Sequence, residues 1–158
     1  MDQLDAGLIA LFTAEPRVGV LAASRRLGVA RGTVQARLDK LEHSGVIQGW
    51  GPEVDPAGLG YTVTAFVTLG IRQIRGHDPL GEQLAAIPEV LEVHTITGSG
   101  DLLCRVVARS NADLQRVIDA IVAVEAVERT STVIALETVV RYRMLPVVLA
   151  AARKGADD

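Results

Sequence analysis

The chain has 158 residues, of which 49% are hydrophobic and 22% charged, a composition that excludes a disordered or fibrous protein. Its formal net charge of −3 excludes a protein that coats nucleic acid with its whole surface. Its single cysteine excludes an internal disulfide. Met1 is followed by Asp2 and Asp5 rather than by a basic and then apolar signal segment, so we expect a cytoplasmic protein. The longest uncharged run, residues 56–71, is too short and too polar to span a membrane.

Three helices are predicted in the first third of the chain. The first begins near Asp2 and Asp5, whose carboxylates can accept hydrogen bonds from free backbone N–H groups. A second is predicted over residues 20–27 and a third over residues 31–43. Gly28 lies between them, where a residue free to adopt positive φ is needed. This spacing predicts a helix-turn-helix.

The third predicted helix has one apolar face and one face suited to a groove. Val34, Leu38 and Leu41 recur at helical spacing. The remaining surface carries small, hydrogen-bonding or basic residues: Arg31, Gly32, Thr33, Ala36, Arg37 and Lys40. Between positions 17 and 40, six basic residues minus one acidic residue give a local charge of +5. From charge and periodicity alone, this segment is either a DNA-binding motif or a solvated helix pair with ordinary surface arginines.

Residues 46–54 are predicted to form two short strands around a Gly-x-Gly-Pro turn. Three helices and a hairpin make a winged helix-turn-helix. We therefore place a DNA-binding domain at residues 1–54, a connector at 55–60, a second domain at 61–143 and a C-terminal tail at 144–158.

The second domain changes to a strand rhythm. Residues 61–71 alternate with period two, which predicts a strand, and a helix follows from Pro79 to Pro88. Two further strands are predicted on either side of a Gly-Ser-Gly turn, at residues 90–97 and 101–109. A second helix then begins at Ser110 as N-cap, and a last strand covers residues 127–138. The order β-α-β-β-α-β predicts an α+β, ferredoxin-like domain.

The predicted sheet is apolar on both faces. A sheet covered by helices on one side only should be polar on the other. Ile96, Leu103 and Val107 therefore need a partner, together with either Phe66 or the alternate set of residues 61–71. A two-fold dimer through the open face would cover them and would present two helix-turn-helix units at once.

The chain resembles the leucine-responsive regulatory protein/AsnC family of transcription regulators, also called feast/famine proteins. In the first half, the resemblance is carried by Leu4-Asp5, Ile9, Leu11, Thr33-Val34, Arg37-Leu38, Leu41-Glu42, Gly45-Val46-Ile47, Asp55-Pro56 and Leu59-Gly60-Tyr61. In the second half, it is carried by Pro88-Glu89-Val90 and by residues 97–103. The order and spacing of these pieces cover nearly the whole chain.

The resemblance implies DNA binding by the first domain and assembly of dimers, commonly to octamers, through the second. It also implies that amino acids or similar metabolites bind between effector domains. In the first domain we expect five residues to form the DNA contact: Arg31, Thr33, Ala36, Arg37 and Lys40. Of these, Arg31, Thr33 and Lys40 carry most of the contact, and Arg37 lies nearer the phosphate backbone.

The chain departs from the family pattern in both domains. Ala30 replaces a capping Ser, and Ala23-Ser24 replaces Leu-Ala. The effector loop, usually Gly-Asp-Tyr-Asp, is Gly-Ser-Gly-Asp here, so the presumed pocket loses one charge and one aromatic wall. DNA binding tolerates these changes more readily than ligand identity does.

The expected effector-binding residues lie in the hairpin turn and on the last strand: Gly98, Ser99, Gly100, Asp101, Thr130, Ser131 and Thr132. Glycines let backbone N–H groups approach a carboxylate, and Asp101 can pair with an amino group. The alternative is a tight turn and a polar strand without a ligand.

An enzyme is one alternative to this interpretation. Cys104, His94 and Asp101 lie close in sequence, but Cys104 and His94 fall on opposite faces of the predicted hairpin. No metal-ligand spacing and no phosphate-binding loop occur, so we expect no catalytic residue, metal or cofactor. The sequence therefore predicts a DNA-binding transcription regulator that responds to an amino acid. The rival hypothesis is an amino-acid-sensing oligomerisation module that has lost its DNA role.

Overall fold

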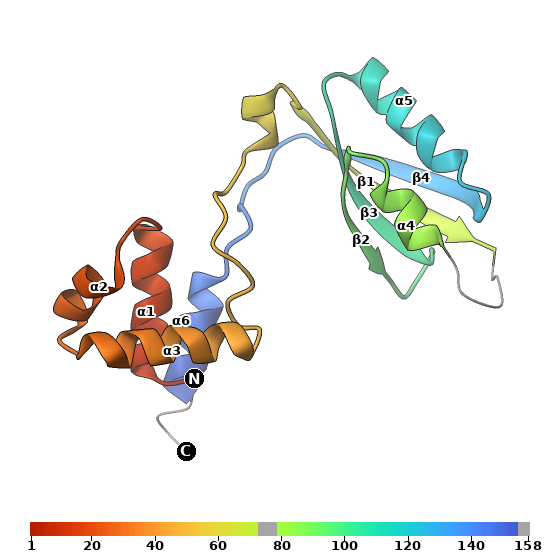
Figure 1. Ribbon diagram of the computed structural model, residues 1–158. Coiled ribbons are helices and arrows are strands. Elements are labelled where there is room, and N and C mark those ends of the chain that lie inside the picture. Colours follow the sequence, from red (N-terminus) through yellow and green to blue (C-terminus); the bar gives the residue numbers. More distant parts are fainter. Residues whose placement is uncertain (73–78, 155–158) are drawn as a thin grey trace. The chain divides into compact units, whose positions relative to one another are not determined.

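The computed structural model describes residues 1–72 and 79–154 and divides the chain into two compact units (Figure 1). The helical unit comprises residues 1–53 together with the chain from Val140 onward. The sheet unit comprises Val54–Val139. Among the described residues, no helix is long and apolar enough to cross a membrane.

The helical unit contains the three predicted helices, α1 (Gln3–Ala14), α2 (Val20–Leu27) and α3 (Arg31–His43). The side chain of Asp2 accepts a hydrogen bond from the Asp5 N–H, and the Asp5 side chain accepts one from the Asp2 N–H. This capping box fixes the start of α1. Gly28 ends α2 with φ 67°, as the turn requires. The core between the helices is formed by Leu8, Ala23, Val34 and Leu38.

The end of the chain differs from the prediction. Residues 144–158 were expected to form a tail, whereas Leu145–Lys154 form helix α6. This helix packs against α1, and its Ala152 is buried. The segment is helical because its apolar residues gain a partner surface, and α6 belongs to the helical unit although it follows the sheet unit in sequence.

The predicted wing hairpin is wrong, because residues 46–54 form no strand. The N–H groups of Val46 and Ile47 both donate to the Leu41 carbonyl, which holds the chain against the end of α3. Beyond them, Pro52 lacks an N–H for a strand ladder. Trp50 instead packs edge-on against Phe12 of α1, with ring centroids 5.1 Å apart.

The sheet unit begins with a 3₁₀ turn, η1 (Pro56–Leu59). Its further elements are β1 (Val63–Ile71), α4 (Leu80–Ala85), β2 (Val90–Thr95), β3 (Leu102–Ala108), α5 (Asn111–Val122) and β4 (Val127–Ala135). The four strands are antiparallel in the order β2-β3-β1-β4. This is the predicted ferredoxin-like arrangement.

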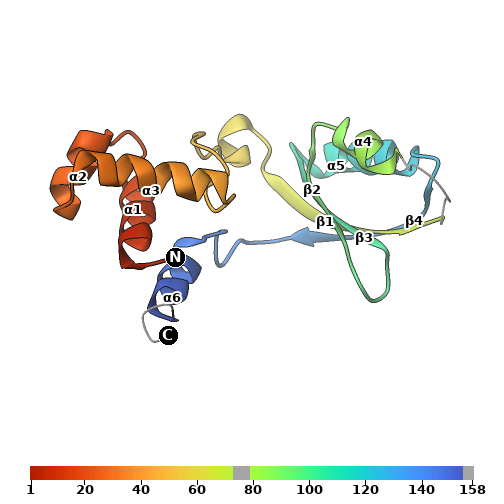
Figure 2. The same cartoon turned by 60° about the horizontal axis from the view of Figure 1, so that its bottom comes forward.

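Both helices of the sheet unit cover the same face of the sheet (Figure 2). The core between them combines strand and helix residues, including Ala65, Val67, Leu69, Cys104, Val106, Leu84, Val117 and Ile121. Phe66 lies opposite Arg105 on β3 and Val133 on β4, and so belongs to the other face. Val133 is 62% exposed. The open face therefore includes Phe66, and the alternate residues of β1 are the buried ones.

Candidate functional site

The outer face of α3 presents four of the five expected DNA-contacting residues. Arg31, Thr33, Ala36 and Lys40 are all exposed, because the apolar residues of α3 turn the opposite face into the core. At the start of the helix, Ala30 is the N-cap and provides no side-chain hydrogen bond. The first backbone N–H groups of α3 therefore lack the side-chain acceptor that a capping Ser would supply.

Arg37, the fifth expected residue, is engaged within the unit. One guanidinium nitrogen, Nη1, lies 3.0 Å from Oδ1 of Asp5 and also bonds to Asp2. Asp5 is 1% exposed, so its carboxylate is buried, whereas the Arg37 side chain is 32% exposed and reaches solvent. The Asp5 backbone N–H and then Arg37 lower the pKa of Asp2 below its ordinary value. Arg37 thus ties α3 to the capped end of α1.

The other basic residues of the helix-turn-helix differ in their surroundings. Arg26 pairs with Glu15. Within the part of the chain that the structure describes, no acidic side chain forms an ion pair with Arg17, Arg25, Arg31 or Lys40. Four of the six positive charges of this segment therefore remain available to an external anion.

The sheet unit has a pocket of about 280 Å³ where the end of β1 lies beside the start of β4. It is lined by Thr68, Gly70, Ser99, Arg129, Thr130 and Ser131. Three of the expected effector-binding residues, Ser99, Thr130 and Ser131, thus come together. Four others do not line the pocket: Gly98, Gly100, Asp101 and Thr132.

Asp101 and Gly100 hold the hairpin turn against β1. The Asp101 N–H donates to the Leu69 carbonyl at 2.8 Å, and the Asp101 carboxylate accepts a hydrogen bond from the Ile71 N–H at 2.9 Å. A Cβ on Gly100 would lie 2.3 Å from Cγ2 of Thr68 and 3.1 Å from the Leu69 carbonyl oxygen, so any larger residue would force Thr68 to move. Gly100 therefore allows the turn to pack closely against β1. Asp101 bonds to the backbone of β1, a contact that was not predicted from the sequence.

Arg129 is a pocket residue that the sequence analysis missed. Its side chain lies over Gly70, where a Cβ would come within 2.4 Å of Nε. Its Nη2 lies 3.4 Å from the Ser99 carbonyl oxygen, so the guanidinium bridges β4 and the hairpin turn. The available signal was Gly70 itself, since a glycine inside a strand pattern often marks the close approach of another group.

Cys104 lies in the core of the sheet unit, opposite Val67 and Val93 in the strand register. Burial raises the pKa of its thiol to about 11. His94 lies opposite Leu103, on the other face. Among the described residues, no group of three or more His, Cys, Asp or Glu side chains could hold a metal ion.

Comparison with protein families matches both halves of the chain. Residues 1–42 match the AsnC-type helix-turn-helix domain, and residues 64–145 match the Lrp/AsnC ligand binding domain. Among curated proteins, the chain is 29% identical over 147 residues to the HTH-type transcriptional regulator FL11 of Pyrococcus horikoshii, covering 93% of this chain and 97% of that protein. It is 27% identical to the regulatory protein AsnC of Escherichia coli, covering 92% and 97%.

Solved structures agree with these matches. The structure of E. coli AsnC superimposes with a TM-score of 0.83 at 26% identity, covering 92% of this chain and 99% of that one. A feast or famine regulatory protein from M. tuberculosis, complexed with L-methionine, gives a TM-score of 0.79 at 27% identity, covering 90% and 96%. With its two domains matched in the same order, the chain belongs to the Lrp/AsnC family of transcription regulators.

Proposed function

We propose that this chain is a sequence-specific DNA-binding transcription regulator whose DNA binding or assembly responds to an amino acid. The observation that carries the proposal is the exposed basic face of α3, with Arg31 and Lys40 unpaired within the described helix-turn-helix. Such a helix fits the major groove of double-stranded DNA, where its side chains reach base edges and phosphates.

Each exposed residue of α3 has a distinct part in this proposal. Arg31 and Lys40 attract phosphates or guanine edges, and Thr33 offers a hydroxyl. Ala36 is small enough to let the helix approach the bases. The uncapped N-terminus of α3 directs backbone N–H groups toward a phosphate. We assign Arg37 to positioning α3, because its Nη1 already bonds to both Asp2 and Asp5.

The DNA proposal is tested by charge reversal at Lys40. The chain has only two lysines, Lys40 on α3 and Lys154 at the end of α6, so Lys154→Glu is a matched control. Lys40→Glu replaces an attraction for phosphate by a repulsion. We expect affinity for genomic operator DNA to fall at least tenfold and the salt dependence of binding to decrease, with Lys154→Glu close to wild type.

Operator DNA for this test can be selected from the source genome with the wild-type protein and quantified by electrophoretic mobility shift. Equal affinity of Lys40→Glu and wild type would remove α3 from the interface. If the wild type selects no DNA, the rival function, an amino-acid-sensing oligomerisation module without a DNA role, replaces the proposal.

The effector proposal rests on the pocket of the sheet unit. Arg129 supplies a guanidinium suited to a carboxylate, and Thr68 and Ser131 supply hydroxyls. Asp101 lies on the adjacent turn and can attract an amino group with the carboxylate oxygen that does not bond to Ile71. The guanidinium of Arg129, the carboxylate of Asp101 and the hydroxyls together suit the carboxylate and amino group of a free amino acid. This is the class of ligand named for the M. tuberculosis relative.

We further propose that this pocket lies between copies of the chain. A dimer through the open sheet face would cover Phe66 and Val133, and dimers would assemble further, to octamers. A ligand that touches two copies shifts assembly as well as local structure, and this coupling can alter DNA binding at a distance.

Arg129→Gln tests the effector proposal. The twenty amino acids at millimolar concentration are screened against the wild type for shifts in melting temperature, oligomer size and DNA affinity. We expect at least one amino acid to cause a shift, and Arg129→Gln to weaken that response at least tenfold because it removes the charge that pairs with the carboxylate. If no amino acid causes any shift in the wild type, the hairpin is only a turn.

A further inference from the structure

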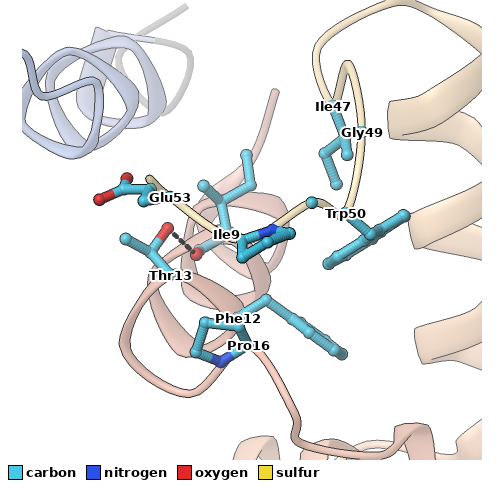
Figure 3. A pocket seen from close by; sticks show the side chains of 10 residues that line it. Ile9, Phe12, Thr13, Pro16, Ile47, Gly49, Trp50 and Glu53 are labelled. Carbon is cyan, nitrogen blue, oxygen red and sulfur yellow. Dashed lines mark hydrogen bonds between the residues drawn. The ribbon is translucent and has the colours of Figure 1, made fainter. Parts of the chain in front are cut away.

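A second pocket, of about 410 Å³, lies in the helical unit between the C-terminal half of α1 and residues 47–53 (Figure 3). Helix α1 contributes Ile9, Phe12 and Thr13, and Pro16 follows just after its end. The segment after α3 contributes Ile47, Gly49, Trp50, Gly51, Pro52 and Glu53. Its volume is within the range of small-molecule sites. It shares no lining residue with the exposed face of α3 or with the pocket of the sheet unit.

Trp50 gives this pocket a fixed apolar wall. Its indole N–H donates to the Glu42 carboxylate at 2.7 Å, and its ring meets Phe12 at 68°. Trp50 nevertheless remains 50% exposed. Because its polar atom is already bonded, its exposed surface is chiefly the apolar ring, and a ligand that covers this ring gains free energy from burial. Pro16 and Pro52 each fix one backbone φ angle in the two walls.

The polar groups of the pocket are acceptors of hydrogen bonds. The Thr13 hydroxyl donates to the Ile9 carbonyl at 2.7 Å, which leaves its lone pairs free to accept. Glu53 has no ion-pair partner within the described part of the chain, and Figure 3 places Glu53 and Thr13 on the side away from Trp50. None of the ten lining residues is basic. The pocket therefore favours a cation and disfavours an anion.

We propose that this pocket binds a small apolar primary amine. The apolar body of the ligand packs against Trp50 and Phe12, and its ammonium group lies toward Glu53 and Thr13. A free amino acid fits less well, because its carboxylate would meet Glu53 without a compensating basic side chain. The site is thus distinct in chemistry, as well as in position, from the proposed amino-acid pocket.

The single tryptophan makes the test direct, since the full-length protein has one indole N–H signal in its NMR spectrum and that signal comes from the pocket wall. Phenethylamine is the probe, and phenylacetate is the matched anion with the same ring. We expect phenethylamine to shift the Trp50 indole signal saturably and phenylacetate to bind at least tenfold more weakly. The absence of a saturable shift, or equal binding of the two probes, would overturn the proposal.

The acid is tested by Glu53→Gln, with Glu125→Gln in the sheet unit as the control of equal net charge. Glu53 is exposed, so its attraction for an ammonium group is modest and its loss should weaken phenethylamine binding about two- to fivefold. Glu125→Gln should bind as the wild type does. Equal weakening by both variants, or by neither, would refute the role of Glu53.

Discussion

At the scale of single residues, the hairpin turn of the sheet unit combines a structural and a chemical demand. The Asp101 carboxylate bonds to the backbone of β1 where the strand register shifts between Gly70 and Ile71. The same carboxylate is proposed to attract the amino group of an effector. One substitution can separate these two demands, because asparagine keeps an acceptor oxygen and removes the charge.

Asp101→Asn should therefore melt near the wild-type temperature while losing the response to the amino acid that shifts the wild type. Asp101→Ala should lose that response and also about 1 kcal/mol of stability, since the Ile71 N–H loses its acceptor. Thermal melts with and without the amino acid measure both effects. If Asp101→Asn responds fully, the charge of Asp101 has no part in recognition.

Gly100 tests the packing of the same turn. Gly100→Ala should destabilise the sheet unit by about 1–3 kcal/mol, because the new methyl group meets Thr68 and the Leu69 carbonyl oxygen, 3.1 Å away. Gly81 on α4 has open space at its Cβ position, so Gly81→Ala is the matched control and should not destabilise. Denaturant titration compares the two variants. Equal stability would contradict the close approach at Gly100.

At the scale of elements, periodicity predicted the helices and strands that depend on residues close in sequence. It missed the elements that depend on contacts with residues far away in sequence. All three helices of the helix-turn-helix and all four strands follow from spacing and capping residues. Helix α6 was not predicted, because it is stabilised by packing against α1, which lies far away in sequence. The prediction of the wing hairpin was wrong because Trp50 contacts Phe12 and Glu42 instead of pairing with another strand. Arg129 was also missed because its partner is distant in sequence: it reaches Gly70 only because β4 pairs with β1.

Arg37 links two of these elements and should affect stability more than DNA contact. Arg37→Gln leaves the buried Asp5 carboxylate without its cation, so the melting temperature of the helical unit should fall by several degrees. Trp50 fluorescence follows this unit, because the chain's one tryptophan lies in it. Lys40→Glu should leave the melting temperature unchanged. If Arg37→Gln left the melting temperature unchanged and Lys40→Glu lowered it, Arg37 would be assigned to the DNA interface instead.

The loss caused by Arg37→Gln should depend on pH. The folded pKa of Asp2 is lowered by the Asp5 N–H and by Arg37, so this carboxylate contributes stability above its unfolded pKa and loses it as the pH falls through the folded value. The difference between wild type and variant should therefore stay constant above about pH 5 and narrow as the pH falls through and below the ordinary aspartate pKa of 3.8. A difference that widens on acidification would contradict this linkage.

At the scale of the whole molecule, the proposed DNA-binding and effector-binding surfaces belong to different units. The helical unit carries the exposed basic face of α3, and the sheet unit carries the proposed effector pocket and the open sheet face. That open face includes Val133, which is 62% exposed and which the helices of the sheet unit do not cover, and exposed apolar surface of this kind indicates association. We expect a symmetric dimer as the smallest unit, since one copy would leave this face in water.

Val133→Glu tests the dimer at its proposed centre. A carboxylate placed on the apolar part of the open face of both copies would be costly to bury, so this variant should sediment as a smaller species than the wild type. Val122 on α5 is also exposed, at 50% against 62% for Val133, but lies in the helical layer, so Val122→Glu should assemble as the wild type does. Analytical ultracentrifugation at micromolar concentration separates the species. A monomeric wild type, or equal effects of the two substitutions, would exclude association through the open sheet face.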